Sequence, residues 1–453
     1  MPSSTPLDIK AGPLRPLWQL AWPVLLEQAL AMMVGFSDTF LTARYLEQPH
    51  LAAMNLMAYA LWLIVDVFIV VSIGATAVIA RHVGAGEAAP ASRAANQSLL
   101  IGGVMVLPLM LIGMALTEQL VAVMQLEGDA AILAVQYLKI VLPALPMVMV
   151  GTVAVACLHG AGDTLSGFIT MGVVNLVNVV LSWALVHGWG PLPRLGWQGI
   201  AIGTTAGYVA GGVIMLGLLL RGRAGLQIHW ECLAPDYNMI RRILRIGVPG
   251  GVDVLAMIAC HFWFVSIINQ LGTVAAAAHG LAIRIESLSY LPGYAFQVAA
   301  STLAGQYLGA GQPRNATRAV LMSCALGGGV MCSAGLLFFF NAETLIATFV
   351  HGDMPTVQAL AAPLLRLAAV GTPFLAATMI LSGALRGVGD TRWPLAITLF
   401  GLLAIRIPGA YVATGWLGLG VRGAWIAMVF DLVARGLLVS ARFWHGGWRK
   451  TRV

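Results

Sequence analysis

The stretch HGAGDTLSG at residues 159–167 decides the fold, because a close copy of it, RGVGDTRWP, stands 227 positions later at residues 386–394. Three more stretches recur at nearly the same offset: Pro23 in LAWPVLLEQ as Pro249 in RIGVPGGVD, RHVGAGEAAPASRA (81–94) as QYLGAGQPRNATRA (306–319), and LGWQGIA (195–201) as LGVRGAW (419–425). The offset stays between 224 and 227 across most of the chain. It therefore indicates an internal duplication.

The composition excludes most soluble proteins. Of the 453 residues, 59% are hydrophobic and only 9% are charged, whereas a soluble domain carries roughly a quarter charged residues. The mean hydropathy is +0.87. A chain of this kind cannot build the charged surface of a soluble enzyme, a nucleic-acid-binding protein or a disordered protein.

Apolar stretches long enough to cross a bilayer occur twelve times. A helix needs roughly 20 apolar residues to span the hydrocarbon core. Candidate spans lie at about 17–43, 51–80, 94–116, 132–157, 165–187, 198–220, 243–270, 274–303, 316–340, 357–384, 393–414 and 421–444. Strand-length alternation of apolar and polar residues does not recur, which argues against a membrane barrel.

The spans and the duplication together predict the architecture. Each half holds six spans, so both halves enter the membrane in the same direction, which implies a pseudo-two-fold axis along the membrane normal. The fold class is an all-α polytopic membrane protein with 12 transmembrane helices in two six-helix lobes. The predicted segments are an N-terminal stretch (1–16), an N-lobe (17–220), a basic linker (221–242), a C-lobe (243–444) and a tail (445–453).

The basic residues predict the orientation. If the N-terminus is cytoplasmic, 17 of the 25 Lys and Arg fall in cytoplasmic segments and three within spans. The outer side holds five: Arg44, Lys139, Arg194, Arg366 and Arg422. Cytoplasmic connections are enriched in Lys and Arg, so we expect both termini in the cytoplasm.

The repeated motifs match a known family. The chain resembles the multidrug and toxic compound extrusion (MATE) family, and the resemblance covers nearly its whole length. The stretches that carry it are Pro23 with Glu27 and Gln28, GFSDTFLTARYL (35–46), the GAG stretch at 84–86, GAGDT (160–164), NLVN (175–178), AAHGLAIRIESLSYLP (277–292), LAGQYLGAGQP (303–313), LRGVGDTRWP (385–394) and GLGVRGAW (418–425). The resemblance implies a twelve-helix antiporter that exports organic cations or other amphiphiles against inward H⁺ or Na⁺.

Placing a charged side chain inside a span costs at least about 2.5–3.5 kcal/mol of insertion free energy, so each such residue requires a functional or structural explanation. Asp38 is the leading candidate for cation coupling, since the resemblance gives that role to the acidic residue at its position. A carboxyl group in an apolar cavity can load and release a proton near neutral pH. The alternative is a structural Asp that is hydrogen-bonded to the backbone.

Depth in the membrane predicts the partners of Asp38. The fifth and sixth spans bring four polar residues to the same outer third of the first lobe: Asn175, Asn178, Ser182 and Thr204. One branch of the family carries a second Asp at the position of Ser182. Only one formal charge remains here, so the sequence favours H⁺ over Na⁺ as the coupling ion, with Na⁺ as the alternative. Ordinary interhelical hydrogen bonding would also explain these residues.

Other charges within the spans are candidates for the cleft between the lobes: Glu27, Asp66, Asp253, Arg284 and Glu286. Glu27 and Asp253 each stand four residues after a duplicated proline, which suggests either substrate binding or a requirement of the fold. Arg284 is interpreted as one member of a structural ion pair. Asp431 and Arg435 have the spacing of a helical pair. Pro23 removes a backbone hydrogen bond inside the first span and predicts a bend there.

Two other functions were weighed. A lipid-linked oligosaccharide flippase of the wider superfamily would carry more basic residues in its cavity. An intramembrane enzyme would be expected to show an acid dyad or HExxH, and the sequence contains no HExxH. No metal site, disulfide framework or cofactor is expected. The expected partners are a small cationic or amphiphilic substrate and the bilayer, with no nucleic acid, and we expect a monomer in a bacterial inner membrane.

Overall fold

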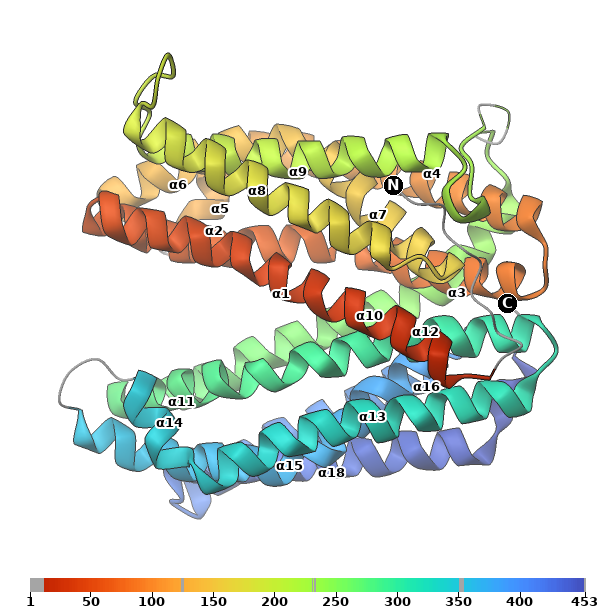
Figure 1. Cartoon of the computed structure of the whole chain (residues 1–453). Coiled ribbons are helices and arrows are strands. Elements are labelled where there is room, and N and C mark those ends of the chain that lie inside the picture. Colours follow the sequence, from red (N-terminus) through yellow and green to blue (C-terminus); the bar gives the residue numbers. More distant parts are fainter. Residues whose placement is uncertain (1–11, 124–125, 230, 232–233, 350–353, 452–453) are drawn as a thin grey trace. The chain divides into compact units, whose positions relative to one another are not determined.

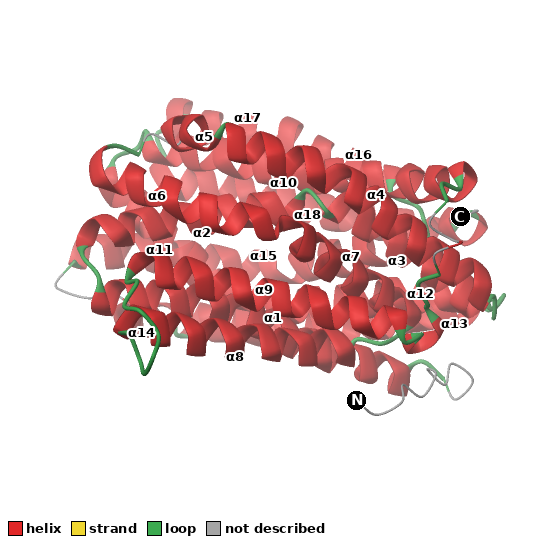
Figure 2. Ribbon diagram, turned by 90° about the horizontal axis from the view of Figure 1, so that it is seen from above, coloured by secondary structure: helices red, strands yellow, loops and turns green. Residues whose placement is uncertain are grey.

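The computed structural model describes residues 12–123, 126–229, 231, 234–349 and 354–451. Helices account for nearly all regular structure in this part of the chain, and strands are absent from it (Figure 2). The all-α polytopic fold predicted from the sequence is confirmed. The predicted terminal segments lie partly outside the described residues.

The chain divides into two compact units, which correspond to the two lobes. Unit 1 holds Trp22–Gly247, and unit 2 holds the chain from Val248 onward together with the first turns of α1. The helices of unit 1 are α1 (Leu14–Tyr45) from Trp22 on, α2 (Gln48–Asp66), α3 (Ile69–Gly84), α4 (Ala88–Ala115), α5 (Thr117–Val123), α6 (Gly128–Val141), the 3-10 turn η2 (Leu142–Ala144), α7 (Leu145–Ala161), α8 (Leu165–His187), α9 (Trp197–Leu220), the 3-10 turn η3 (Arg223–Gly225) and the start of α10 (Tyr237–Asn269) (Figure 1).

Unit 2 repeats this order of helices. After α10 come α11 (Thr273–Glu286), the 3-10 turn η5 (Ser287–Ser289), α12 (Tyr290–Gly309), α13 (Pro313–Phe340), α14 (Ala342–Phe349), α15 (Pro355–Gly387), α16 (Arg392–Phe400), the π turn η6 (Gly401–Arg406), α17 (Ile407–Tyr411), the π turn η7 (Val412–Trp416), α18 (Gly420–His445) and the 3-10 turn η8 (Gly447–Lys450). Its core is built around Trp425 and Phe264, which are almost completely buried.

Within the described residues, ten helical segments are long and apolar enough to cross a membrane. The other two predicted spans, 51–80 and 274–303, are each divided into two helices. The first divides between Asp66 and Ile69, and the second at η5. Hydropathy measures composition and does not register a break in the backbone, which is why each pair was predicted as one span.

The boundary between the lobes differs from the predicted linker at 221–242. Gln227, His229 and Asp236 of this segment are hydrogen-bonded to Ser92, Asn96 and Gln97 on α4 of unit 1. The first turns of α10 also belong to unit 1. A Cβ atom at Gly74 would overlap the carbonyl oxygen of Ile243, and one at Gly247 would overlap that of Val70. This glycine contact between α3 and α10 moves the boundary to Gly247.

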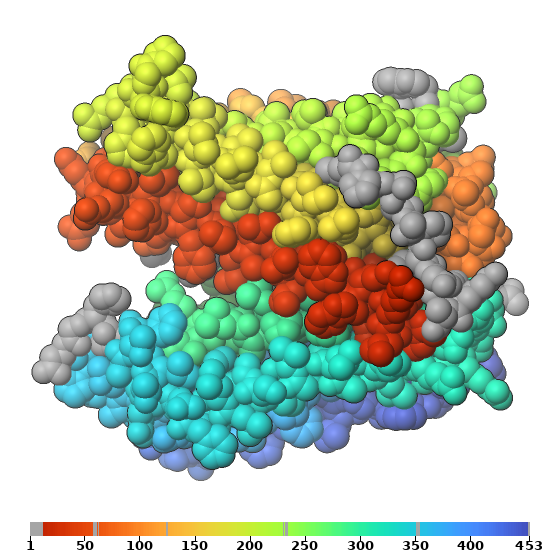
Figure 3. Space-filling model, in the orientation of Figure 1, coloured from red at the N-terminus to blue at the C-terminus, as the bar shows by residue number. Residues whose placement is uncertain are grey.

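The duplicated glycines occupy equivalent turns. Gly86 and Gly311, the last residues of the two GAG stretches, have φ of 77° and 70°. Gly162 and Gly389, which precede the two Asp-Thr pairs, have φ of 92° and 85°. These are left-handed conformations that favour glycine. The connection between α8 and α9 likewise turns on glycines, and it projects beyond the helix ends (Figures 1 and 3).

Candidate functional site

The Asp38 carboxylate of α1 is buried between α8 and α9. The Asn178 amide donates from Nδ2 to Asp38 Oδ1 at 3.0 Å, and the Thr204 hydroxyl donates to Asp38 Oδ2 at 2.6 Å. Asn178 Nδ2 also lies 3.0 Å from Thr204 Oγ1. All three side chains are at most 2% exposed. The site therefore consists of one carboxylate and two neutral donors inside unit 1.

Thr204 has a second acceptor within reach. Its Oγ1 lies 3.1 Å from the carbonyl oxygen of Ile200, one turn back on α9. A hydroxyl carries one proton and can rotate between two acceptors. If Asp38 is protonated, its new O–H can donate to Thr204 Oγ1 while the Thr204 proton turns to the Ile200 carbonyl. Both protonation states of Asp38 can thus be hydrogen-bonded without moving the backbone.

Glycines on α9 bring these side chains together. Gly203 faces Ser182 on α8, and Gly207 faces the Val174 carbonyl and the Asn178 side chain. With no Cβ at these two positions the helices approach closely. The sequence here consists of small residues (GTTAG, 203–207), which leave room for the Asn178 side chain to reach α1.

Gly203→Ala tests this close approach. The added methyl group would overlap the Ser182 hydroxyl and lie 2.7 Å from its backbone nitrogen, so the two helices must separate. We expect a loss of about 1–3 kcal/mol in stability together with reduced transport, measured by thermal unfolding in detergent and by dye export. Gly103→Ala on α4 is the control, since a Cβ there meets nothing within 4 Å. If Gly203→Ala matched this control, the packing argument would be wrong.

Two of the predicted partners of Asp38 contact other groups. Asn175 donates to the carbonyl oxygens of Leu30 and Met171, so it ties α8 to α1 about two turns before Asp38. The Ser182 hydroxyl faces the Ile200 carbonyl at 3.5 Å. Both residues share the correct face of α8, but each lies about one turn from Asn178, and their side chains contact these groups instead of the Asp38 carboxylate.

Two tyrosines near Asp38 were not predicted. Tyr137 on α6 and Tyr208 on α9 lie close enough to Asp38 for electrostatic interaction with its carboxylate. Tyr137 also makes a side-chain hydrogen bond with Thr204. A tyrosine in an apolar span needs a polar partner for its hydroxyl, and that signal could have identified them.

The equivalent place in unit 2 holds a different set of residues. At the 226-residue offset of the prolines, Asp38 corresponds to Phe264. At the 227-residue offset of the GDT stretches, Asn178 corresponds to Ile405. The π turn η6 contains one extra residue, which shifts the register by one and brings in Arg406. The Arg406 guanidinium lies 5.9 Å from the centre of the Phe264 ring.

Arg406 is held by a buried ion-pair network. Its guanidinium lies 2.8 Å from Asp431 Oδ2, and Arg435 donates to both oxygens of Asp431 at 2.8 Å. The predicted pair Asp431–Arg435 is therefore present, and Arg406 was the member not foreseen. Glu286, which is 2% exposed on α11, is a second acidic residue near Arg406.

Each lobe has a close contact between two helices at this location. The glycine that allows the contact lies on one helix in unit 1 and on the other helix of the pair in unit 2. Gly207 of unit 1 corresponds to Asp431 at the 224-residue offset, and Val174 corresponds to Gly401 at the 227-residue offset. In unit 1 the glycine faces Val174, whereas in unit 2 it is Gly401 that makes room for the Asp431 carboxylate. The same location thus holds a lone carboxylate in one lobe and, in the other, a carboxylate bound by two arginines.

Glu27 and Asp253, predicted as possible cleft charges, are buried within their own lobes. Glu27 Oε2 lies 3.2 Å from His159 Nε2, and Asp253 Oδ2 lies 2.9 Å from Arg386 Nη1. Both acids are at most 5% exposed. Of the two roles left open by the sequence, these contacts favour a requirement of the lobe itself over direct substrate binding.

The remaining predicted charges lie apart from the Asp38 site. Arg284 is exposed, and no ion pair joins it to another of the described residues, so its role in a structural ion pair stays a prediction. Glu286, two residues further along α11, is buried. Asp66 is half-buried at the last position of α2. Pro23 lies inside α1, which continues unbroken as a helix, so a bend there stays a prediction.

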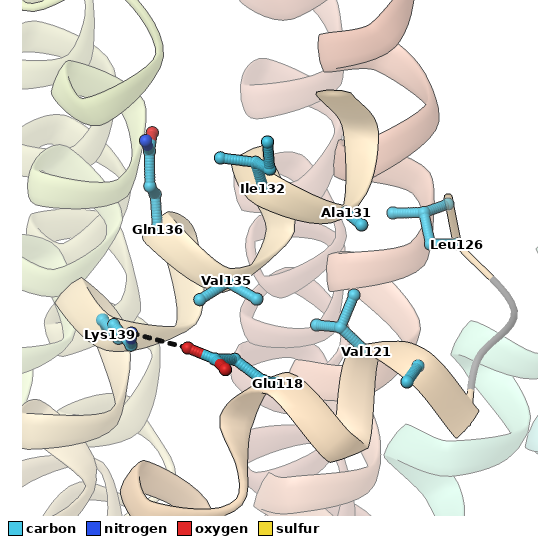
Figure 4. A pocket seen from close by; sticks show the side chains of 9 residues that line it. Glu118, Val121, Leu126, Ala131, Ile132, Val135, Gln136 and Lys139 are labelled. Atoms are coloured by element: carbon cyan, nitrogen blue, oxygen red, sulfur yellow. Dashed lines mark hydrogen bonds and ion pairs between the residues drawn. The ribbon is translucent and has the colours of Figure 1, made fainter. Parts of the chain in front are cut away.

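Further ion pairs are duplicated in parallel positions. Asp163 pairs with Arg223 and Asp390 with Arg442 after the GDT turns, while Lys139–Glu118 and Arg366–Glu343 pair at the other end of each lobe. A pocket of about 430 Å³ lies beside the Lys139–Glu118 pair, between α5 and α6, and is lined mainly by apolar side chains (Figure 4). It shares no residue with the Asp38 site. Within the described residues no group of three metal-binding side chains occurs.

A family model agrees with this duplicated arrangement. The model named MatE matches residues 23–184 and again residues 249–412. The two matches begin at the duplicated prolines and together cover well over half of the chain.

Curated relatives match over nearly their full length. The chain is 30% identical over 441 residues to a protein of Thermotoga maritima named probable multidrug resistance protein NorM, covering 96% of this chain and 93% of that protein. It is 26% identical over 467 residues to the multidrug resistance protein PmpM of Pseudomonas aeruginosa, covering 98% and 93%.

Solved structures share the fold. An outward-facing conformation of a multidrug resistance MATE family transporter of the MOP superfamily matches with a TM-score of 0.91 at 20% identity, over 100% of both chains. A MATE structure in a bent conformation matches equally well, with a TM-score of 0.91 at 20% identity over 99% of both chains.

Proposed function

The chain belongs to the MatE family, and from that premise we propose that it exports organic cations or amphiphiles in exchange for protons, with Asp38 as the group that binds the proton. It is a membrane-embedded multidrug transporter with small-molecule substrates, and its function is transport and not enzymatic catalysis.

The hydrogen bonding of Asp38 carries the proposal. Both oxygens of its carboxylate accept bonds from neutral groups, and the Thr204 hydroxyl has the Ile200 carbonyl as a second acceptor. The group can therefore gain and lose a proton while its surroundings remain hydrogen-bonded. An ionisable residue at bilayer depth is by default a functional group.

The second lobe supports a single coupling site. The place equivalent to Asp38 and Asn178 is occupied by Phe264 and Arg406, and Arg406 is bound to Asp431, which also binds Arg435. Two guanidiniums share one carboxylate there, so positive charge remains and disfavours an exchangeable cation at that location by charge repulsion. This asymmetry supports a coupling group at this location in the first lobe alone.

Sodium coupling is the second candidate, and one observation favours it. Asn178 Oδ1 is buried and has no hydrogen-bond partner among the described residues. A carbonyl oxygen beside a carboxylate and a hydroxyl is a possible ligand for a hard cation. Against it stands the single formal charge, because Ser182 replaces the second carboxylate found in one branch of the family.

The structure gives no support to the alternative function of a lipid-linked oligosaccharide flippase. Such a transporter needs basic groups in its cavity that are available to bind pyrophosphate. The two arginines deep in unit 2, Arg406 and Arg435, are largely buried and both bound to Asp431. The inner membrane as location, cytoplasmic termini and a monomeric state complete the proposal, on the basis of the basic segments and the bacterial relatives.

The proposal is tested by export of a fluorescent cationic dye from cells that lack their own pumps. The expected result is export that a protonophore abolishes and that continues in Na⁺-free medium. Export that requires Na⁺ and survives the protonophore would establish the sodium alternative. Absence of export with the protein present in the membrane would remove cations as the substrate class.

Thr204→Val tests the hydroxyl beside Asp38. Valine keeps the shape of threonine but cannot donate to the carboxylate, and a hydrogen bond to a charged group contributes about 1.5–3 kcal/mol. We therefore expect the initial rate of dye export to fall by roughly 10–100-fold. The matched control is Thr205→Val, because the Thr205 hydroxyl donates to the Ala201 carbonyl and does not contact Asp38. Equal rates in the two variants would contradict the relay.

A further inference from the structure

A buried ion pair recurs in both lobes with a different base in each. In unit 1 it joins Glu27 on α1 to His159 at the end of α7, and in unit 2 it joins Asp253 on α10 to Arg386 at the end of α15. The acids stand four residues after Pro23 and Pro249, and the bases are the first residues of the two duplicated GDT stretches. The contact itself is therefore duplicated, and only the base differs.

Both pairs are removed from water. The side chains of Glu27 and His159 are 6% and 8% exposed, and those of Asp253 and Arg386 are 2% and 13% exposed. Gly167 on α8 closes the first pair, since a Cβ atom there would collide with the Glu27 carboxylate and approach His159 Nε2 to 3.2 Å. A carboxylate in such a place depends on its partner for compensation of its charge.

The two bases differ in one chemical property. Arginine is charged at every pH that a cell reaches, so the Asp253–Arg386 pair is permanent. Histidine is the side chain that ordinarily gains and loses its charge between about pH 5 and 8. The same contact is thus fixed in one lobe and dependent on a proton in the other.

We propose that Glu27 and His159 form a second proton-binding site of the first lobe, at the end opposite Asp38, where loading and release of one proton controls the attachment of α1 to α7. The inference rests on the proposed function, in which this end faces the cytoplasm. When His159 binds a proton from water, the pair is charged on both sides and holds α1 next to Pro23. When the proton returns to water, Glu27 faces a neutral imidazole and the attachment weakens.

Among the described residues, ionisable groups lie near His159 on its own segment and on neighbouring helices. Glu27 faces it from α1, and one turn further along its own segment Asp163 is neutralised by Arg223 and bonded to the Ser166 hydroxyl. The other helices that pack near it add these ionisable side chains: Arg81 and His82 at the end of α3, Arg93 at the start of α4, Tyr208 on α9, and His187 at the far end of α8. Glu27 is the ionisable group in direct contact with the His159 ring, so the protonation of His159 acts directly on this contact.

This site is separate from Asp38. The two acids of α1 are eleven residues apart, which is about 16 Å along a helix. Asp38 is bonded to Asn178 and Thr204, whereas Glu27 contacts His159 on α7 and lies against Gly167 at the opposite end of α8. A proton at one site therefore leaves the hydrogen bonds of the other unchanged, and the sites can be loaded at different stages of a cycle.

The second lobe supplies the test variant, because His159→Arg copies its pair into the first lobe. Transport of a cationic dye is measured in proteoliposomes at constant pH difference while the pH on the His159 side is varied from about 6 to 8. For the wild type we expect the rate to change about tenfold over this range, as one group titrates. For His159→Arg and His159→Gln we expect this dependence to disappear. Arg386→Lys, which keeps a permanent charge, is the control and should retain the wild-type profile.

The variants separate a proton site from a structural contact. A purely structural pair would be restored by arginine, so a wild-type rate and pH profile in His159→Arg would overturn the inference. Wild-type transport that continues unchanged in the presence of a protonophore would instead overturn the proposed function itself. Should both variants misfold, Glu27→Gln tests the same site from the acid side: a retained pH profile overturns the proposal, and a lost profile supports it.

A direct titration adds a readout that does not depend on transport. The nine histidines of the full-length protein are labelled with ¹⁵N, and the His159 ring signal is assigned by its loss in His159→Gln or in His159→Arg. The expected result is a signal that titrates between about pH 5 and 8 and moves when Glu27 is changed to Gln. A signal that stays constant over this range would contradict the inference.

Discussion

The Asp38→Asn variant is expected to transport no cationic dye above the level of protein-free vesicles. Asparagine has nearly the same shape and can still bond Asn178 and Thr204, so the packing of α1 against α8 and α9 is retained. It cannot bind and release a proton, and the first lobe then has no group at this location that responds to a pH gradient. The loss should appear in the initial rate of dye uptake into inverted proteoliposomes driven by a proton gradient.

A matched acid on the surface serves as its control. Glu343 pairs with Arg366 at an exposed position on α14, and its side chain is 77% exposed. Glu343→Gln removes one carboxylate by the same chemical change and should transport like the wild type. Substantial proton-driven transport by Asp38→Asn would rule out Asp38 as the proton-binding group.

The second large effect concerns stability. Asp431→Asn removes the carboxylate that holds both Arg406 and Arg435, which are buried in unit 2. Breaking a buried ion pair by deleting one partner costs roughly 3–5 kcal/mol, because an uncompensated charge stays behind. We expect a clearly lowered temperature of thermal unfolding, followed with a thiol-reactive dye that reports exposure of buried cysteines such as Cys157 and Cys260.

Glu343→Gln is again the reference for this measurement. It breaks an exposed ion pair, and such pairs contribute only about 0–1 kcal/mol. The unfolding temperature of this variant should stay close to that of the wild type. An Asp431→Asn protein as stable as Glu343→Gln would show that the Arg406 network does not support the second lobe.

Part of the Asp38 site follows from the sequence by simple geometry. The depth of a residue in its span and the direction of that span predict which side chains share a layer, and this reasoning brought Asp38, Asn178 and Thr204 together. It could not decide which neighbour completes the bond, because a difference of one helical turn is within the uncertainty of a span boundary. Asn175 and Ser182 were therefore included, and Tyr137 on α6 was missed.

The ion pairs show the same limit more strongly. The pair Asp431–Arg435 is local, so its four-residue spacing predicts it. The partners of Glu27 and Asp253 lie more than 130 residues away in the sequence, and only the tertiary fold of each lobe brings them together. Arg406 escaped prediction because a π turn changes the register of its helix. The breaks after Asp66 and at η5 escaped because hydropathy records composition alone.

The most direct test of the account is a measurement of proton movement with substrate. Wild-type protein and Asp38→Asn are reconstituted in vesicles without any ion gradient, and a cationic dye gradient is imposed in Na⁺-free buffer while the internal pH is recorded. The account predicts that the wild type moves protons against the dye and that Asp38→Asn moves none. Dye transport without proton movement, or unchanged proton movement in Asp38→Asn, would contradict it.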